Sequence, residues 1–116
     1  MNQGFEAVLL REASTTTLVL RGELDLSAAG AADQAVDMAL DDRAGAYVLD
    51  LTDLRYLNAA GATPLVRLAV AARRDGARVT ARRAGRLPAM VLRMTPVELE
   101  DPPTPLGGKA VRAPAA

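Results

Sequence analysis

A nearly unbroken apolar strand followed closely by a helix start constrains the fold more than any other feature of this chain. Residues Ala46–Leu51 are mostly large and apolar, which is typical of a central strand in a sheet. A short polar connection then leads to Asn58-Ala59-Ala60-Gly61. Asn58 is a good helix N-cap, because its side-chain oxygen can accept a hydrogen bond from the N–H of Ala60 or Gly61. This order predicts an α/β unit.

The rest of the chain alternates between strand and helix patterns in the same way. Arg11–Thr15 is polar and suits a hairpin turn, Ser27 can cap the first helix, and Asp75-Gly76 suits a helix end. The alternation predicts a sheet with parallel central strands and helices packed on it. The expected elements are strands at Phe5–Leu10, Thr15–Arg21 and Ala77–Ala81, and helices at about Ala29–Asp41, from Asn58 to Asp75, and at Leu87–Met94.

Composition excludes several kinds of chemistry. The 116 residues are enough for about one domain. Cysteine and histidine are both absent, which excludes disulfides, thiol chemistry, a Cys/His zinc site and imidazole as a base. No apolar run approaches the roughly eighteen residues that span a bilayer, and the first residues do not resemble a secretory signal. We therefore expect a cytoplasmic protein that is not inserted in a membrane and has no metal site.

The charges balance to zero but are distributed unevenly. Residues 1–54 contain three arginines and ten carboxylates, whereas residues 55–93 contain nine arginines and one carboxylate. This asymmetry could steer a charged partner, or it could simply reflect an arginine-rich surface. The spacing of Asp33, Asp37 and Asp41 indicates an acidic helix face. The basic cluster at residues 82–86 is not accompanied by stacking aromatic residues, so we do not expect nucleic-acid binding.

Pro64 complicates the helix that Asn58 would cap. A proline about six residues into a helix removes one backbone hydrogen bond and clashes with the preceding turn. The favoured interpretation is a frayed or distorted first turn. In the alternative register, Thr63 is the N-cap and Pro64 occupies the first helical position. After Pro96 the chain becomes rich in Pro, Gly and Ala, so we expect a domain over residues 1–96 and a disordered tail over residues 97–116.

Three segments together resemble the STAS domain, the fold of anti-sigma-factor antagonists. Val19–Val36 (VLRGELDLSAAGAADQAV) is similar to the family's second strand, Gly-Glu-Leu-Asp turn and first helix. Gly45–Gly61 (GAYVLDLTDLRYLNAAG) is similar to its central strand and phosphosite loop, and Ala71–Pro96 resembles the remainder more loosely. The resemblance implies a mixed sheet of four to five strands with a parallel central part, packed by about three helices. The family's closing helix is not recognisable after Thr95.

The resemblance also implies which residues matter. In the family, the hydroxyl residue just before the glycine of the helix start accepts a phosphate; here that position is Ala60, and the preceding aspartate is Asn58. The family's partner-binding surface would comprise Glu23, Asp25 and the tetrapeptide Asn58, Ala59, Ala60 and Gly61. Thr63 and Thr52 are other hydroxyls, but neither occupies the family position.

Three functions remain open. The resemblance implies a non-enzymatic module without a cofactor that binds an anti-sigma factor of the serine-kinase type and, without a hydroxyl at Ala60, cannot be switched at the family site. It could instead imply an accessory subunit of a transport ATPase or a scaffold in a signalling complex. A small-molecule binder or enzyme is the third possibility, although the sequence has no phosphate-binding glycine loop and no catalytic dyad. Glu23 and Asp25 alone do not make a metal site.

Overall fold

The sheet keeps its five strands in chain order, β1-β2-β3-β4-β5. The computed structural model describes residues 4–100 of the chain. β1 pairs antiparallel with β2, and every later pair is parallel. The predicted mixed sheet with about three helices is confirmed. The strands are β1 (Phe5–Glu12), β2 (Thr15–Leu24), β3 (Ala46–Leu57), β4 (Arg78–Arg82) and β5 (Glu98–Leu99), and the helices are α1 (Ala29–Asp41), α2 (Ala59–Arg74) and α3 (Arg86–Leu92), with a short 3-10 helix, η1 (Leu26–Ala28).

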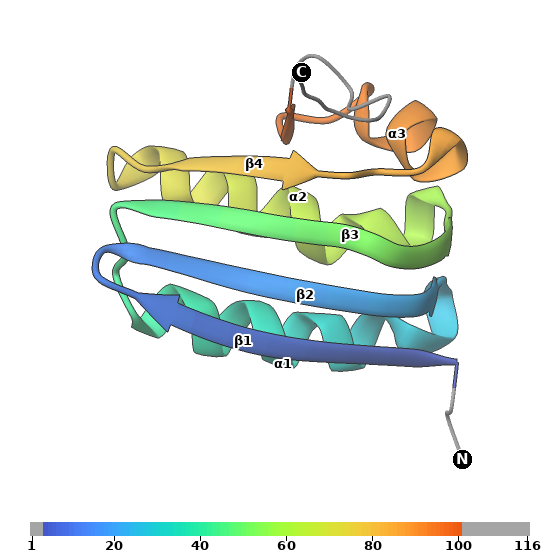
Figure 1. Ribbon diagram of the computed structural model, residues 1–116, viewed down its shortest axis with the longest axis horizontal. Coiled ribbons are helices and arrows are strands. Elements are labelled where there is room, and N and C mark those ends of the chain that lie inside the picture. Colours follow the sequence, from blue (N-terminus) through green and yellow to red (C-terminus); the bar gives the residue numbers. More distant parts are fainter. Residues whose placement is uncertain (1–3, 101–116) are drawn as a thin grey trace, which may run out of the picture.

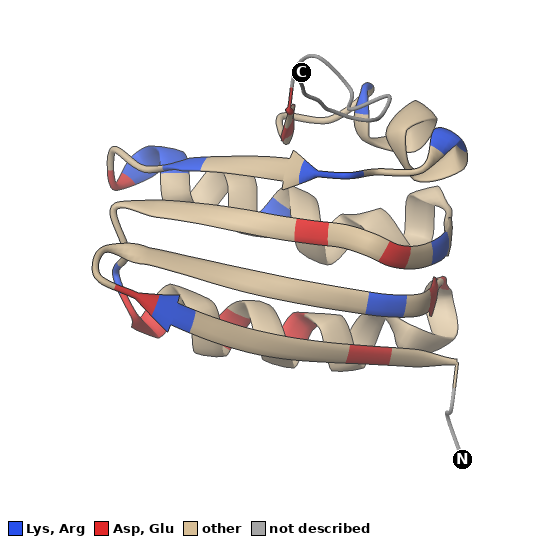
Figure 2. Ribbon diagram, viewed as in Figure 1, with Lys and Arg blue, Asp and Glu red and all other residues tan. Residues whose placement is uncertain are grey.

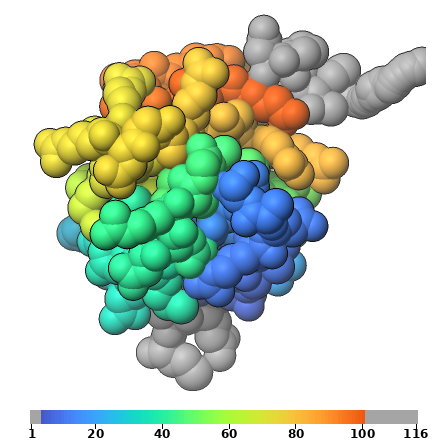
Figure 3. All heavy atoms as spheres, turned by 90° about the vertical axis from the view of Figure 1, so that its left-hand side faces the viewer, coloured from blue at the N-terminus to red at the C-terminus, as the bar shows by residue number. Residues whose placement is uncertain are grey.

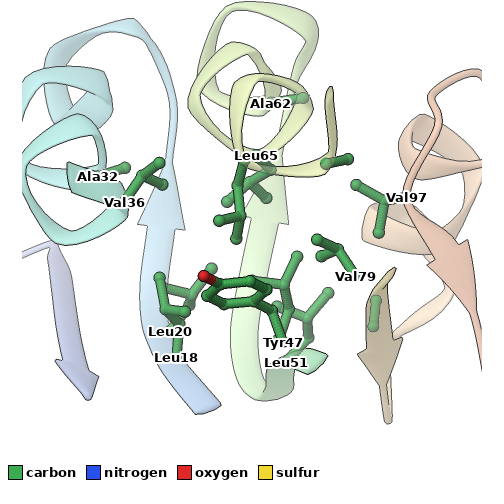
Figure 4. Packing of buried hydrophobic residues seen from close by; sticks show 14 of the residues in the cluster. Leu18, Leu20, Ala32, Val36, Tyr47, Leu51, Ala62, Leu65, Val79 and Val97 are labelled. Carbon is green, nitrogen blue, oxygen red and sulfur yellow. The ribbon is translucent and has the colours of Figure 1, made fainter. Parts of the chain in front are cut away.

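Helices α1 and α2 both lie on one face of the sheet, behind the strands in Figure 1. The core is the layer between them, where leucines and valines of β2, β3, α1 and α2 meet (Figure 4). Leu18 and Leu20 point from β2 into this layer and are fully buried. Val36 of α1 and Leu65 of α2 close the layer from the helical side. The opposite face of the sheet has no helix in the described part of the chain.

Strand β3 is longer than the sequence predicted, ending at Leu57 rather than at Leu51. Its alternation of buried and exposed residues breaks after Leu51, where two consecutive exposed residues precede each buried one. The pairing with β2 shifts register twice in this region, and each shift adds one residue to β3. These irregularities are β-bulges, which disturb the two-residue period without ending a strand.

The other predicted elements are found close to their expected bounds. The first helix begins and ends where the sequence placed it, at Ala29 and Asp41. Gly76, with φ of +82°, follows the end of α2 in the left-handed conformation that glycine adopts readily. Strand β5 lies just after residue 96, where the sequence analysis placed the end of the domain. Most of the expected tail, residues 101–116, lies outside the described residues.

At one end of the sheet, the β1–β2 turn and the α1–β3 connection lie side by side (Figure 3). The backbone N–H of Gly45 donates to the carbonyl of Ser14 at 2.7 Å. Asp42 links the same segments through its side chain, because it accepts from the Thr16 hydroxyl at 2.7 Å and from Arg11 Nε at 2.8 Å. Thr16 is buried, so this carboxylate satisfies a hydroxyl that water does not reach.

Candidate functional site

The candidate site lies at the carboxyl ends of β2 and β3, on the right in Figure 1. Two segments that are more than thirty residues apart in sequence meet here: the end of β2 and the turn that follows it, with Glu23 and Asp25, and the start of α2, with Asn58 to Gly61. The pairing of the strands causes this meeting, since Glu23 is opposite Tyr56 and Leu24 is opposite Leu57. The six residues of the predicted partner-binding surface therefore belong to one end of the sheet.

Asp25, and not Ser27, caps the helical segment after β2. Its Oδ1 accepts hydrogen bonds from Ser27 N at 2.9 Å and from Ser27 Oγ at 2.7 Å. The bond from the Ser27 hydroxyl is the main reason why the pKa of Asp25 lies below its ordinary value. The predicted cap at Ser27 is wrong, because a turn of 3-10 helix comes first and α1 begins after Ala28 without a side-chain cap.

Asn58 caps α2, as the sequence predicted. Its Oδ1 accepts from Gly61 N at 2.9 Å, and its backbone carbonyl accepts from Ala62 N at 2.9 Å. Its Nδ2 also lies 3.4 Å from the Tyr56 hydroxyl, to which it donates. These contacts fix the side chain of Asn58 in the orientation that an N-cap requires.

Gly61 brings α2 against the end of β2. A Cβ built at Gly61 would overlap the backbone carbonyl of Leu24 and lie 3.0 Å from Asp25 N. The backbone N–H of Asn58 also donates to the Leu24 carbonyl, at 3.4 Å. Only a residue without a side chain permits this approach. The glycine therefore sets the distance between the two halves of the site.

Pro64 lies inside α2 without breaking it. The helix runs continuously from Ala59 to Arg74, so the expected frayed first turn and the alternative start at Thr63 are both wrong. The proline forfeits one hydrogen bond, to the carbonyl of Ala60. Its ring is fully buried, and this burial offsets part of the loss.

The hydroxyls near the site already have intramolecular partners. Thr63 Oγ1 donates to the carbonyl of Ala59 at 3.3 Å, one helical turn back. Thr52 Oγ1 donates to Asp50 Oδ1 at 2.7 Å. Partial burial raises the pKa of Asp50, but hydrogen bonds from Thr52 and the nearby positive charges of Arg82 and Arg83 outweigh it. The pKa of Asp50 therefore lies below its ordinary value. Ala60 itself is partly exposed in the first turn of α2.

Two exposed apolar residues beside the site were not singled out from the sequence. Leu26 follows Asp25 and is 74% exposed, and Tyr56 precedes the cap at Asn58 and is 39% exposed. Leu26 falls in an apolar-polar pattern that suits a core residue equally well, so sequence alone gives no signal. Apolar residues such as Met38 and Met94 are exposed elsewhere on the surface as well, so it is the position of Leu26 and Tyr56 beside the polar turn that connects them with the site.

The uneven charges form two regions of the surface. Acidic residues are concentrated on α1, and arginines lie along β4 and α3 (Figure 2). The acidic face of α1 is partly neutralised by Arg67 of α2, whose Nη atoms lie 3.1 Å from Asp33 Oδ1 and 2.9 Å from Asp37 Oδ1. Part of this acidic face therefore joins two helices. Among residues 4–100, no group of three or more acidic side chains could hold a metal ion.

The comparison with family models decides the classification. The model described as "Mlab, STAS domain" matches residues 8–98, which is most of the chain. This protein belongs to the STAS domain family. A comparison with curated proteins finds no significant match. In the described residues of this STAS domain, no helix has the length and apolar character needed to cross a membrane.

Solved structures show the same fold. The STAS domain has a TM-score of 0.70 to an anti-sigma factor antagonist from Mycobacterium paratuberculosis, at 22% identity over 84% of this chain and 86% of that one. The TM-score is 0.66 to the antagonist SpoIIAA in its unphosphorylated form, at 14% identity over 84% and 87% of the two chains. It is 0.63 to phosphorylated SpoIIAA from Bacillus, at 15% identity over 93% and 92%.

Proposed function

We propose that this STAS domain is a non-enzymatic, protein-binding regulatory module of the anti-sigma-factor antagonist type. Its docking surface is the end of the sheet where Glu23 and Asp25 lie beside the start of α2. Its partner is an anti-sigma factor of the serine-kinase type. Because Ala60 occupies the family's phosphorylation position, the module binds its partner without being switched there.

The observation that carries this proposal is the fixed contact between the β2 turn and the α2 start. Gly61 against Leu24 and the bond from Asn58 N to the Leu24 carbonyl hold the two segments together. A docking surface that is already assembled loses less conformational freedom on binding. The exposed side chains of Leu26 and Tyr56 supply apolar contact area beside it.

The chemistry of the helix start supports the absence of a switch. A helix N-terminus favours negative charge because of its free N–H groups and its dipole, so a phosphate in the first turn would be stabilised there. The side chain of Ala60 is a methyl group and cannot accept one. Thr63 lies three residues beyond the family position at Ala60. Its hydroxyl donates to the carbonyl of Ala59 in the same helix, which supports its assignment as a structural hydroxyl.

Titration calorimetry with a purified kinase-type anti-sigma factor from the same genome tests the binding. We expect wild type to bind equally well with ATP or with a non-hydrolysable analogue. Leu26→Asp should weaken binding by about tenfold or more. Met38→Asp, at another exposed apolar residue that lies on α1, should bind like wild type. The absence of binding by wild type, or equal loss in both variants, would contradict the proposed surface.

Phosphate transfer tests the lost switch separately. With labelled ATP and the same kinase, wild type should remain unlabelled, whereas Ala60→Ser should become labelled and dissociate from the complex. Labelling of wild type that disappears in Thr63→Ala would show that Thr63 has replaced the family site. The claim that the module is unswitchable would then be wrong, even if the docking surface were right.

A second candidate is an accessory subunit of a transport ATPase. The matching family model is described as "Mlab, STAS domain" and does not name an antagonist, so the family match is compatible with the second candidate as well as with the first. The same calorimetric titration discriminates the two. Binding to a purified ATPase subunit from the same genome, weakened by Leu26→Asp, with no binding to the anti-sigma factor, would support the second candidate.

A further inference from the structure

The two edges of the sheet differ in how well they are protected. Edge strands expose unpaired backbone groups, and proteins commonly protect them by shortness, proline, bulges or charge. β5 has only two residues and follows Pro96, and Glu98 forms an ion pair with Arg78. β1 has eight residues, contains no proline and pairs with β2 without a register shift. Its middle, Ala7–Leu10, contains no charged residue.

The backbone groups on the outer side of β1 follow from its pairing with β2. Glu23 N donates to the carbonyl of Gly4, one position beyond the paired residues Phe5 and Gly22, so Gly4 and Glu23 continue the antiparallel ladder as a hydrogen-bonded pair. Such pairs alternate with non-bonded pairs, so the even-numbered residues of β1 bond to β2. The N–H and C=O groups of the odd-numbered residues therefore point outward. In the described part of the chain no strand pairs with this side.

The side chains of β1 divide between the two faces of the sheet. Phe5, Ala7 and Leu9 pack against the core. Val8 and Leu10 lie on the other face, which neither α1 nor α2 covers, and Leu10 is 52% exposed. The outer edge thus combines unpaired backbone groups with apolar side chains that have no cover on one face.

We propose that β1 pairs antiparallel with β1 of a second copy of this chain, about a two-fold axis through Val8, so that one continuous sheet spans both copies. A two-fold axis perpendicular to the sheet brings like faces together, so odd-numbered residues must pair with odd-numbered ones. Centring on Val8 pairs Phe5 with Arg11 and Ala7 with Leu9. Every outward backbone group of β1 then has a partner.

The neighbouring registers are less favourable. Centring on Leu9 places Glu6 directly opposite Glu12 of the second copy, and like charges in that position are destabilising. Centring on Ala7 leaves Arg11 opposite a residue before the start of β1. The Val8 register avoids both faults. It also leaves the ends of β2 and β3 free, so the dimer would present two docking surfaces that face in opposite directions.

Disulfide cross-linking tests the register directly, because the full chain contains no cysteine. In the proposed dimer Val8 faces itself in a non-bonded pair with Cα atoms about 4.5 Å apart, which suits a disulfide. Val8→Cys should therefore form a covalent dimer on mild oxidation. Val19→Cys is the matched control, since Val19 is opposite Val8 within the chain and lies one strand inward. Equal cross-linking of both variants, or none with Val8→Cys, would overturn the proposal.

Sedimentation equilibrium of the full chain tests the association without cross-linking. Wild type should show a reversible monomer–dimer equilibrium, and Leu10→Glu, which sets a carboxylate opposite Glu6 of the second copy, should raise the dissociation constant by about tenfold. Met90→Glu, at a similarly exposed residue on α3, beyond the opposite edge of the sheet, should associate like wild type, and circular dichroism checks that both variants fold. A wild type that stays monomeric at every concentration refutes the dimer. If Leu10→Glu does not fold, the cross-link at residue 8 decides.

Discussion

Gly61 of α2 lies so close to Leu24 of β2 that no side chain fits between the helix and the strand. The contact joins the first turn of α2 to the backbone carbonyl of Leu24, the last residue of β2. The Leu24 carbonyl also accepts a hydrogen bond from the backbone N–H of Asn58. The position of the α2 start relative to the β2 turn therefore depends on a single missing methyl group.

Gly61→Ala should destabilise the fold, although alanine normally favours a helix. We expect a loss of about 1–3 kcal/mol in the free energy of unfolding, because the backbone of Leu24 must move. Gly30→Ala in α1 is the matched control, since a Cβ there meets nothing within 4 Å. That variant should gain about 0.5–1 kcal/mol. Urea denaturation measures both, and equal effects would contradict the close contact.

Asn58→Ala should remove the cap of α2 and cost about 1 kcal/mol. Asn58→Asp keeps an acceptor oxygen for Gly61 N and adds a negative charge at the helix start, so its stability should equal or exceed that of wild type. Thermal unfolding of the three proteins gives the comparison. A fully stable Asn58→Ala would mean that the helix start does not depend on this side chain.

Arg67→Met should weaken the contact between α1 and α2. Arg67 pairs with both Asp33 and Asp37 but is 41% exposed, so we expect a loss of only about 0.5–1 kcal/mol at low salt. The loss should shrink as salt rises, because exposed charges are screened. Arg74→Met is the control, since Arg74 has no ion pair in the described part of the chain. A loss that is independent of salt would indicate packing rather than charge.

The Asp42 carboxylate should make stability depend on acid pH. The hydrogen bonds from Thr16 and then Arg11 hold its pKa below the ordinary 3.8. A lowered pKa means that the folded state binds the proton less readily than the unfolded state. The stabilisation is thus fully present above pH 3.8 and is lost as the pH falls through the lower folded value.

Asp42→Asn provides the comparison for this pH dependence. The variant should be less stable than wild type near neutral pH, and the difference should narrow on acidification below pH 3.8. Thermal melts over a pH series measure it. A constant difference at every pH would show that the charge of Asp42 is not what stabilises the turn.

The sequence predicted the helices and strands well where apolar residues recur at one constant spacing along the whole element. The first helix and the hairpin follow directly from apolar spacing and turn residues. The end of β3 does not, because two β-bulges change the period after Leu51. The cap at Asp25 was also missed, since Asp25 and Ser27 are both good caps and only the 3-10 turn decides between them.

The candidate site was predictable in its residues but not in its assembly. Asn58 was identified as a cap from its chemistry alone. The role of Gly61 was not, because its close neighbour, Leu24, is distant in sequence and no local pattern connects them. The continuity of α2 through Pro64 depends on the burial of its ring, which is likewise a property of the tertiary packing.

The bond from Glu23 N to the carbonyl of Gly4 has a practical consequence for handling this protein. It places the beginning of β1 at the same end of the sheet as the candidate site (Figure 1). An affinity tag or fluorophore fused ahead of Gly4 would therefore emerge next to Glu23 and could obstruct a docking partner.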